Sequence, residues 1–127
     1  MKISIITAVY NRNKTIKNAI MSIKEQTYKN IELIIIDGGS TDGTINTIQE
    51  IIDEKDTFIT EPDNGIYDAL NKGLKIATGD VIAFLHSDDI YSNSFVLSSV
   101  IERFQDQKTD IVYGDIGHDE FYSYHKE

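Results

Sequence analysis

The alternation of two kinds of apolar segment is the feature that most constrains the fold of this chain. Residues 3–9 (ISIITAV) and 31–37 (IELIIID) are almost continuous apolar, largely β-branched runs, as is typical of strands buried on both faces of a parallel sheet. Between them, four apolar residues recur at the i, i+3, i+4, i+7 spacing of an amphipathic helix: Ile16, Ala19, Ile20 and Ile23. This order predicts a right-handed βαβ unit.

The same alternation continues along the rest of the chain. Further strands are predicted over residues 57–60, 81–85 and 110–115, with amphipathic helices between them. The helix over residues 66–77 is expected to turn three residues inward: Ala69, Leu70 and Ile76. The pattern predicts an α/β fold of βαβαβαβαβ order, with a mostly parallel sheet and helices on both faces. Because there is no repeat or linker, we expect residues 1–127 to form a single domain.

Composition excludes several classes of function. The chain has no cysteine, so it has neither disulfides nor thiolate metal sites. Its net charge of −9 argues against nucleic acid or an anionic membrane surface as a partner. No apolar run is long enough for a transmembrane helix, and the first residues are typical of a strand rather than a signal peptide. We therefore expect a cytoplasmic location, with peripheral attachment to the inner face of the membrane left open.

Polar residues follow the predicted strands, at the point where each strand ends. Parallel strands connected by right-handed crossovers bring these ends to one edge of the sheet, where open α/β sheets bind ligands. The segments concerned are Tyr10–Arg12, Asp37–Ser40, His86–Asp89 and Gly114–Asp115. Carboxylates at three of these ends suit a divalent metal ion or hydrogen bonds to a ribose and a base.

Each of these acidic residues also has a purely structural interpretation. Asp42 is more typical of a helix N-cap than of a ligand, and Asp37 is as typical of a turn as of a binding group. Asp88 and Asp89 could form a solvated turn in which Asp89 or Ser92 caps the next helix. The shared position at one edge of the sheet is what favours a binding site.

Four segments together resemble the N-terminal half of family 2 glycosyltransferases with the GT-A fold. They are ISIITAVYNR, EQTYKNIELIIIDGGSTDGT, DNGIYDALNKGLKIATGDVIAFLHSDD and IVYGD, in family order over roughly residues 1–117. The resemblance implies a Rossmann-like nucleotide-sugar-binding domain. It also implies transfer of a sugar from a nucleoside-diphosphate donor, commonly a UDP-sugar, to a hydroxyl of a glycan or lipid carrier. A non-catalytic nucleotide-binding or assembly module is the alternative.

The resemblance also implies roles for individual residues. Tyr10 matches the aromatic residue that packs on the nucleobase, and Asp37 matches the carboxylate region that recognises the base. Gly38 stands where many relatives have a second aspartate. In the HSDD segment, Asp88 would hold the ribose or share the metal, and Asp89 would bind Mg²⁺ or Mn²⁺ on the diphosphate. Three further residues match a motif near the donor: Asp68, Asn71 and Lys72.

A metal ion explains why two like charges stand side by side at a strand end. A bound cation would neutralise Asp88 and Asp89 and stabilise the charge that develops on the departing diphosphate. Inverting transfer also needs a general base, which in the family lies beyond the metal motif. We therefore expect this chain to be the donor-binding part, truncated before the acceptor-binding half. The sugar, the acceptor and the oligomeric state are left open.

Overall fold

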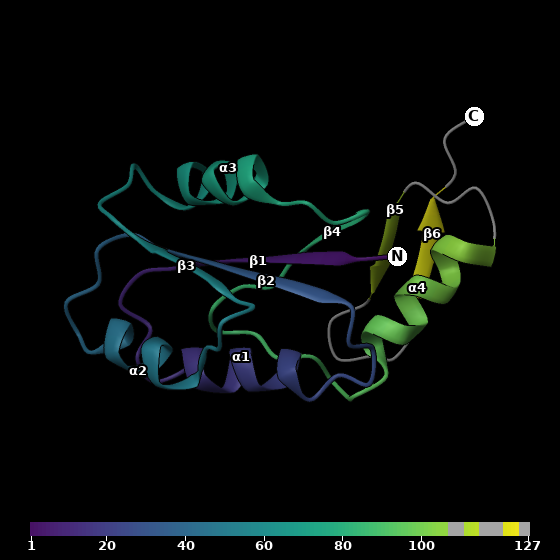
Figure 1. Cartoon of the computed structure of the whole chain (residues 1–127), viewed down its shortest axis with the longest axis horizontal. Helices are drawn as coiled ribbons and strands as arrows, with labels where there is room; N and C mark the ends of the chain where they lie inside the picture. Colours follow the sequence, from purple (N-terminus) through teal and green to yellow (C-terminus); the bar gives the residue numbers. More distant parts are fainter. Residues whose placement is uncertain (107–110, 115–120, 125–127) are drawn as a thin grey trace. The chain divides into compact units, whose positions relative to one another are not determined.

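A four-stranded parallel sheet forms the centre of the first of two compact units in the computed structural model (Figure 1). The structure describes residues 1–106, 111–114 and 121–124. The first unit comprises Met1–Met21 and Asn30–Ile90, and the second comprises Ser22–Lys29 and Tyr91–Glu127. The strands of the parallel sheet lie in the order β3 (Thr57–Thr60), β2 (Ile31–Asp37), β1 (Ile3–Val9) and β4 (Val81–Phe84).

The two central strands are the β-branched runs that the sequence identifies as buried. Strands β1 and β2 pair in parallel over their whole length, from Ile3 opposite Ile31 to Val9 opposite Asp37. Their isoleucines make up most of the largest fully buried side chains of this unit: Ile3, Ile5, Ile6, Ile34, Ile35 and Ile36. Because the pairing is in register, Val9 and Asp37 end their strands together, and the loops that follow start from the same edge.

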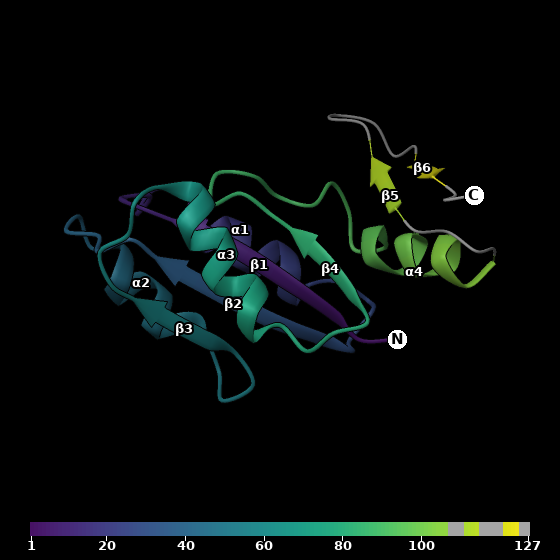
Figure 2. The same cartoon turned by 90° about the horizontal axis from the view of Figure 1, so that it is seen from above.

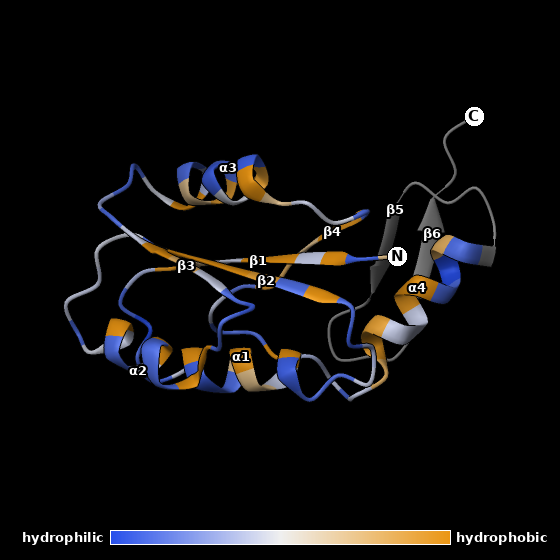
Figure 3. Cartoon of the chain, viewed as in Figure 1, coloured by the Kyte–Doolittle hydropathy of each residue, from blue (hydrophilic) through white to orange (hydrophobic). Residues whose placement is uncertain are grey.

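Helices cover both faces of this sheet, as the sequence predicts. Helix α2 (Thr44–Ile51) and the first turns of α1 (Ile16–Lys24) lie on one face, and α3 (Ile66–Ile76) lies on the other (Figures 1 and 2). The hydrophobic sides of α1 and α2 are turned toward the strands (Figure 3). Ile16, Ala19 and Ile20 are fully buried, which confirms the amphipathic spacing of the first helix.

Helix α3 approaches the sheet more closely than its sequence indicates. A Cβ atom on Gly73 would lie 2.5 Å from Cγ2 of Ile6, so only glycine allows this separation. Ala69 is buried as expected, but Ile76 is 38% exposed, so its expected inward position is wrong. The helix ends at Ile76, and the extended residue that follows, Ala77, packs against the core cluster instead.

The second unit contains α4 (Val96–Asp106) and a two-stranded antiparallel sheet. Strand β5 (Ile111–Gly114) pairs with β6 (Phe121–Tyr124), so the prediction that residues 110–115 add a fifth strand to the parallel sheet is wrong. Ile111, Val112 and Tyr113 give this segment high strand propensity, but propensity does not specify a partner. Asp115, the last residue of the expected strand, lies outside the described residues.

The buried side chain of Gln26 connects two parts of the second unit. Its amide group donates a 2.7 Å hydrogen bond to the carbonyl of Asn93, and its Oε1 accepts one of 3.0 Å from the backbone N–H of Leu97. The side chain therefore satisfies backbone groups at and before the start of α4.

Across the described residues, none of the helices has the length and hydrophobicity needed to cross a membrane.

Candidate functional site

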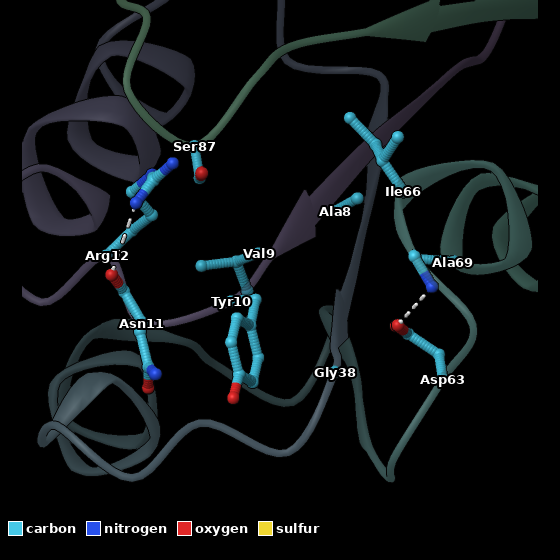
Figure 4. Close-up of a pocket in the computed structure, with 11 residues that line it drawn as sticks. Ala8, Val9, Tyr10, Asn11, Arg12, Gly38, Asp63, Ile66, Ala69 and Ser87 are labelled. Carbon is cyan, nitrogen blue, oxygen red and sulfur yellow. Dashed lines mark hydrogen bonds between the residues drawn. The ribbon is translucent and has the colours of Figure 1, made fainter.

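A pocket of about 620 Å³ opens in the first unit at the carboxyl ends of the strands (Figure 4). Its walls come from the end of β1, the residue after β2, the start of α3 with its preceding loop, and the loop after β4. The lining residues are Ala8, Val9, Tyr10, Asn11, Arg12, Gly38, Asp63, Gly65, Ile66, Ala69 and Ser87. The pocket lies at the edge predicted from the sequence and has the size of a small-molecule site.

The loop after β1 is held to the loop after β2 and to the start of α2 by hydrogen bonds between backbone N–H groups and side-chain oxygens. The N–H of Asn11 donates to Ser40 Oγ at 2.8 Å, and Oδ1 of Asn11 accepts from the N–H of Thr41 at 2.8 Å. The N–H of Arg12 donates to Thr44 Oγ1 at 3.0 Å. Asn11 has a φ of 49°, a left-handed conformation that asparagine tolerates better than most residues. These bonds fix the backbone that presents Tyr10 and Arg12 to the pocket.

Asp37 is fully buried beneath this site, and protein donors occupy both of its carboxylate oxygens. Oδ2 accepts hydrogen bonds from the N–H groups of Gly39 and Ser40, both at 2.9 Å, and from the Thr60 hydroxyl at 2.8 Å. Oδ1 accepts from the Ser40 hydroxyl at 2.5 Å. A buried carboxylate with this set of donors holds together the turn after β2 and the end of β3.

Asp42 likewise accepts hydrogen bonds from backbone N–H groups, at the start of α2. Its Oδ1 accepts from the N–H of Thr44 at 3.0 Å, and its Oδ2 accepts from the N–H of Asn13 at 3.1 Å. The hydrogen bond from the Thr44 hydroxyl is the main reason that the pKa of Asp42 lies below its ordinary value. The N-cap position of α2 is Gly43, so Asp42, which the sequence suggests as the cap, lies one position before it. Asp42 still accepts a hydrogen bond from the first N–H group of the helix, that of Thr44.

The HSDD segment forms an exposed turn after β4. The N–H of Asp89 donates to the carbonyl of His86 at 3.0 Å, and Ser87 between them is buried and lines the pocket. His86, Asp88 and Asp89 are exposed. In the described part of the chain, neither aspartate side chain has a hydrogen bond or an ion pair. Both carboxylates are therefore accessible to a ligand.

These two carboxylates suit a hard divalent cation that also takes oxygen atoms from a ligand. No group of three or more His, Asp, Glu or Cys side chains that could hold a metal occurs among the described residues. Magnesium is commonly bound by one or two carboxylates together with phosphate oxygens and water, so Asp88 and Asp89 fit such a shared site.

The sequence-predicted residues on α3 contact the loop that precedes this helix. Lys72 Nζ lies 2.9 Å from Glu61 Oε1 and 3.6 Å from Asp68 Oδ2. Oδ2 of Asp68 also accepts a 3.0 Å hydrogen bond from the N–H of Asn64. The hydrogen bond to Glu61 is the main reason that the pKa of Lys72 is raised. Asn71 is exposed on the same helix.

The structure therefore brings only part of the predicted site together. Of the seven lining residues outside β1 and α3, Tyr10 is the one that the sequence assigns to the ligand. Arg12 and Asp63 also line the pocket, although the sequence gives them no role. Arg12 lies two residues after the strand-end aromatic residue Tyr10, and an acidic protein needs such a cation to hold an anionic ligand. Asp63 lies in a turn cluster around the single proline, which offers no signal of its position.

Comparison with known proteins gives a consistent assignment. The family described as "Glycosyl transferase family 2" matches residues 4–126. A Haemophilus influenzae protein named "Uncharacterized glycosyltransferase" is 47% identical over 94 residues, which are 72% of this chain and 38% of that protein. A Mycobacterium bovis "PGL/p-HBAD biosynthesis glycosyltransferase" is 34% identical over 117 residues, which are 89% of this chain and 46% of that protein.

Solved structures show the same similarity. S. aureus TarS 1-349 in complex with UDP-GlcNAc has a TM-score of 0.78 and 26% identity, covering 88% of this chain and 33% of that chain. The mannosyltransferase PcManGT from Pyrobaculum calidifontis, in complex with GDP-Man and Mn²⁺, has a TM-score of 0.74 and 26% identity, covering 80% of this chain and 31% of that chain. The chain spans less than half the length of each of these proteins.

Proposed function

Because this chain belongs to glycosyl transferase family 2, we propose that it forms the donor-binding part of an enzyme that transfers a sugar from a nucleoside diphosphate to a glycan or lipid-carrier hydroxyl. The observation that supports this proposal is the strand-end pocket itself. It combines an aromatic ring, a guanidinium group and the buried serine that precedes two accessible carboxylates. Complexes of structural neighbours with UDP-GlcNAc and GDP-Man support a nucleotide-sugar ligand.

In this proposal the nucleotide lies along the end of β1. Tyr10 is 57% exposed, so its ring offers a flat apolar surface on which a base can stack. Arg12 presents a planar guanidinium that suits the oxygens of a diphosphate. Because this cation lies in the pocket, a chain with a net charge of −9 can still bind an anionic donor.

We assign the metal to the turn after β4. Asp89, with Asp88, would hold Mg²⁺ or Mn²⁺, and Asp88 is also available to the ribose. The bound ion would neutralise the charge that develops on the departing diphosphate. The Mn²⁺ in the PcManGT complex supports a divalent ion, and the exposure of both carboxylates is what this assignment requires.

The other residues that the sequence assigned to the donor have a supporting role in this account. Asp37 holds the turn that carries Gly38, and Asp68 with Lys72 holds the loop before α3. Direct contact between the donor and these residues or Asn71 stays a prediction. We further propose inverting transfer, with the general base and the acceptor site supplied by sequence outside these 127 residues.

Thermal unfolding with UDP, GDP, CDP, ADP and dTDP, each with and without Mn²⁺, tests the proposal. A nucleotide at about 100 times its dissociation constant should stabilise the fold by roughly 2.7 kcal/mol. We expect a shift with one nucleotide that requires Mn²⁺, is lost in Asp89→Ala, and persists in the control Glu54→Ala, which removes another exposed carboxylate.

Two outcomes would contradict the proposal. Absence of any shift, in both this chain and the full-length protein, would exclude a nucleotide site. Nucleotide binding without sugar transfer by the full-length protein would favour the non-catalytic module. The cytoplasmic location expected from the sequence also stays a prediction, which fractionation of cells expressing the full-length protein would test.

A further inference from the structure

A carboxylate from the loop after β3 fills the space beside Gly38 in the pocket wall. A Cβ atom on Gly38 would lie 2.8 Å from Oδ2 of Asp63 and 3.1 Å from its Cγ and Oδ1. Gly38 does not have the left-handed φ of its neighbour Gly39, so its backbone would accept other residues. The reason for glycine at position 38 is therefore the room that it leaves for the Asp63 side chain.

Asp63 is held in this position by its own loop and by both ends of that loop. Its Oδ1 accepts a 3.0 Å hydrogen bond from the N–H of Gly65, which is drawn in Figure 4. Before it, the N–H of Glu61 donates to the carbonyl of Asp37 at 3.1 Å, and the Glu61 side chain pairs with Lys72. No described residue donates a hydrogen bond to Oδ2, which leaves this oxygen as a fixed acceptor at the pocket.

We propose that Asp63 is a specificity-determining residue that recognises the base of the donor. Its Oδ2 accepts a hydrogen bond from the ring N–H that uracil, thymine and guanine carry at N3 or N1. Cytosine and adenine have a lone pair at the corresponding ring nitrogen, and a carboxylate, which only accepts hydrogen bonds, repels it. The inference rests on the proposed function and specifies the class of nucleotide that the site takes.

The position of Tyr10 supports this assignment. Tyr10 lies between Arg12 on one side of the pocket and the pair of Gly38 and Asp63 on the other (Figure 4). A base stacked on Tyr10 would turn its edge toward one of these two sides. With the diphosphate directed to Arg12, the base edge faces Asp63.

Nucleotide affinities measured by calorimetry, with Mn²⁺ present, test the inference in two matched pairs. UDP and CDP both carry a pyrimidine, and GDP and ADP both carry a purine. Within each pair, the first base has a hydrogen on the ring nitrogen at N3 or N1, and the second has a lone pair there. We expect the wild-type protein to prefer UDP over CDP, or GDP over ADP, by roughly 10- to 100-fold. In Asp63→Asn, whose amide can both donate and accept, the preference should fall to within about threefold. Glu54→Gln, which removes a distant exposed carboxylate, should keep it.

A second pair of variants relocates the carboxylate. Gly38→Asp alone places a side chain against Oδ2 of Asp63 and should weaken binding of the preferred nucleotide. Adding Asp63→Gly removes the clash and should restore the original preference. Unfolding midpoints of Asp63→Asn and Glu54→Gln should match that of the wild-type protein, which separates base recognition from folding, whereas Gly38→Asp alone should unfold at a lower temperature because it carries the clash.

The possible results are distinguishable. An unchanged preference in Asp63→Asn, an equal loss of affinity for every nucleotide, or a wild-type preference for CDP or ADP would overturn the role of Asp63 and leave the proposed function standing. If the wild-type protein binds none of the nucleotides, the proposed function fails as well.

Discussion

The turns after β2 and after β4 both carry acidic residues at the same edge of the sheet, but they use them in opposite ways. After β2, Asp37 is fully buried and Asp42 is bonded to backbone N–H groups, so each carboxylate has protein donors. After β4, Asp88 and Asp89 are exposed, and no described residue donates to them. The carboxylates of the first turn already have hydrogen-bond donors in the free protein. Those of the second turn have none among the described residues, so they are available to a ligand.

In the proposed function, this difference separates a structural turn after β2 from a ligand-binding turn after β4. A carboxylate already surrounded by donors stabilises the turn and gains little from a ligand, whereas two adjacent unpaired carboxylates repel each other until a cation binds. Substitutions in the first turn should therefore change stability, and substitutions in the second should change binding and rate.

The largest effect is expected for Asp89→Ala. Loss of a major electrostatic stabiliser should lower the transfer rate of the full-length enzyme by about 10²- to 10³-fold. Because the side chain is exposed, the free energy of unfolding should change by no more than about 0.5 kcal/mol. Steady-state kinetics and chemical denaturation measure the two quantities. A variant that loses stability together with activity would show that this turn is also part of the scaffold.

The opposite result is expected for Asp37→Ala. The N–H groups of Gly39 and Ser40 and the Thr60 hydroxyl would lose their buried acceptor, which should lower the free energy of unfolding by about 3 kcal/mol. Denaturant titration measures this loss, and the near-isosteric Asp37→Asn should lose less. Unchanged stability combined with lost nucleotide affinity would instead favour the direct base contact that the resemblance implies.

A smaller effect is expected for Ser40→Ala. The Ser40 hydroxyl accepts from the N–H of Asn11 and donates to Asp37, so it connects two loops of the site. Its removal should cost about 1–2 kcal/mol in unfolding free energy. Thr41→Ala, an exposed neighbour with a backbone contact only, is the matched control and should stay within about 0.5 kcal/mol.

The smallest effect concerns the pH dependence of stability. The pKa of Asp42 is lowered from 3.8 in the folded state, chiefly by the hydrogen bond from the Thr44 hydroxyl. Its contribution is therefore present above pH 3.8 and is lost as the pH falls through the folded-state pKa. The stability difference between the wild-type protein and Asp42→Asn, followed by denaturation from pH 7 to pH 2, should shrink on acidification. A difference that is the same at all pH values would exclude this linkage.

The sequence predicts the parallel sheet well because its central strands are long and β-branched. The bounds of β1 and β2 in the structure are those of the two apolar runs, and the strand-end pocket follows from their parallel pairing. The partner of β5 is not encoded locally, since the same propensity serves a parallel or an antiparallel neighbour. The segment that contains β6 has no clear period, so its aromatic residues alone do not identify a strand.

The details of the site are less predictable from the sequence, because they depend on which carboxylates already accept hydrogen bonds from the protein. The pattern that marks Asp37 and Asp89 as strand-end carboxylates is the same, and only the geometry shows that one is buried and the other exposed. Asp63 is missed because its place in the pocket depends on the absence of a side chain at Gly38, which is distant in sequence.

The most direct test of the account is to locate the metal and the nucleotide on the ¹⁵N-labelled chain by NMR. With UDP and Mg²⁺, the amide signals of Tyr10 and Gly38 should shift, and replacing Mg²⁺ with Mn²⁺ should broaden the signals of Ser87, Asp88 and Asp89 most strongly. Broadening centred on another acidic segment, such as residues 53–56, with no shift at Tyr10 or Gly38, would contradict the central claim that the strand-end pocket binds a metal-bound nucleoside diphosphate.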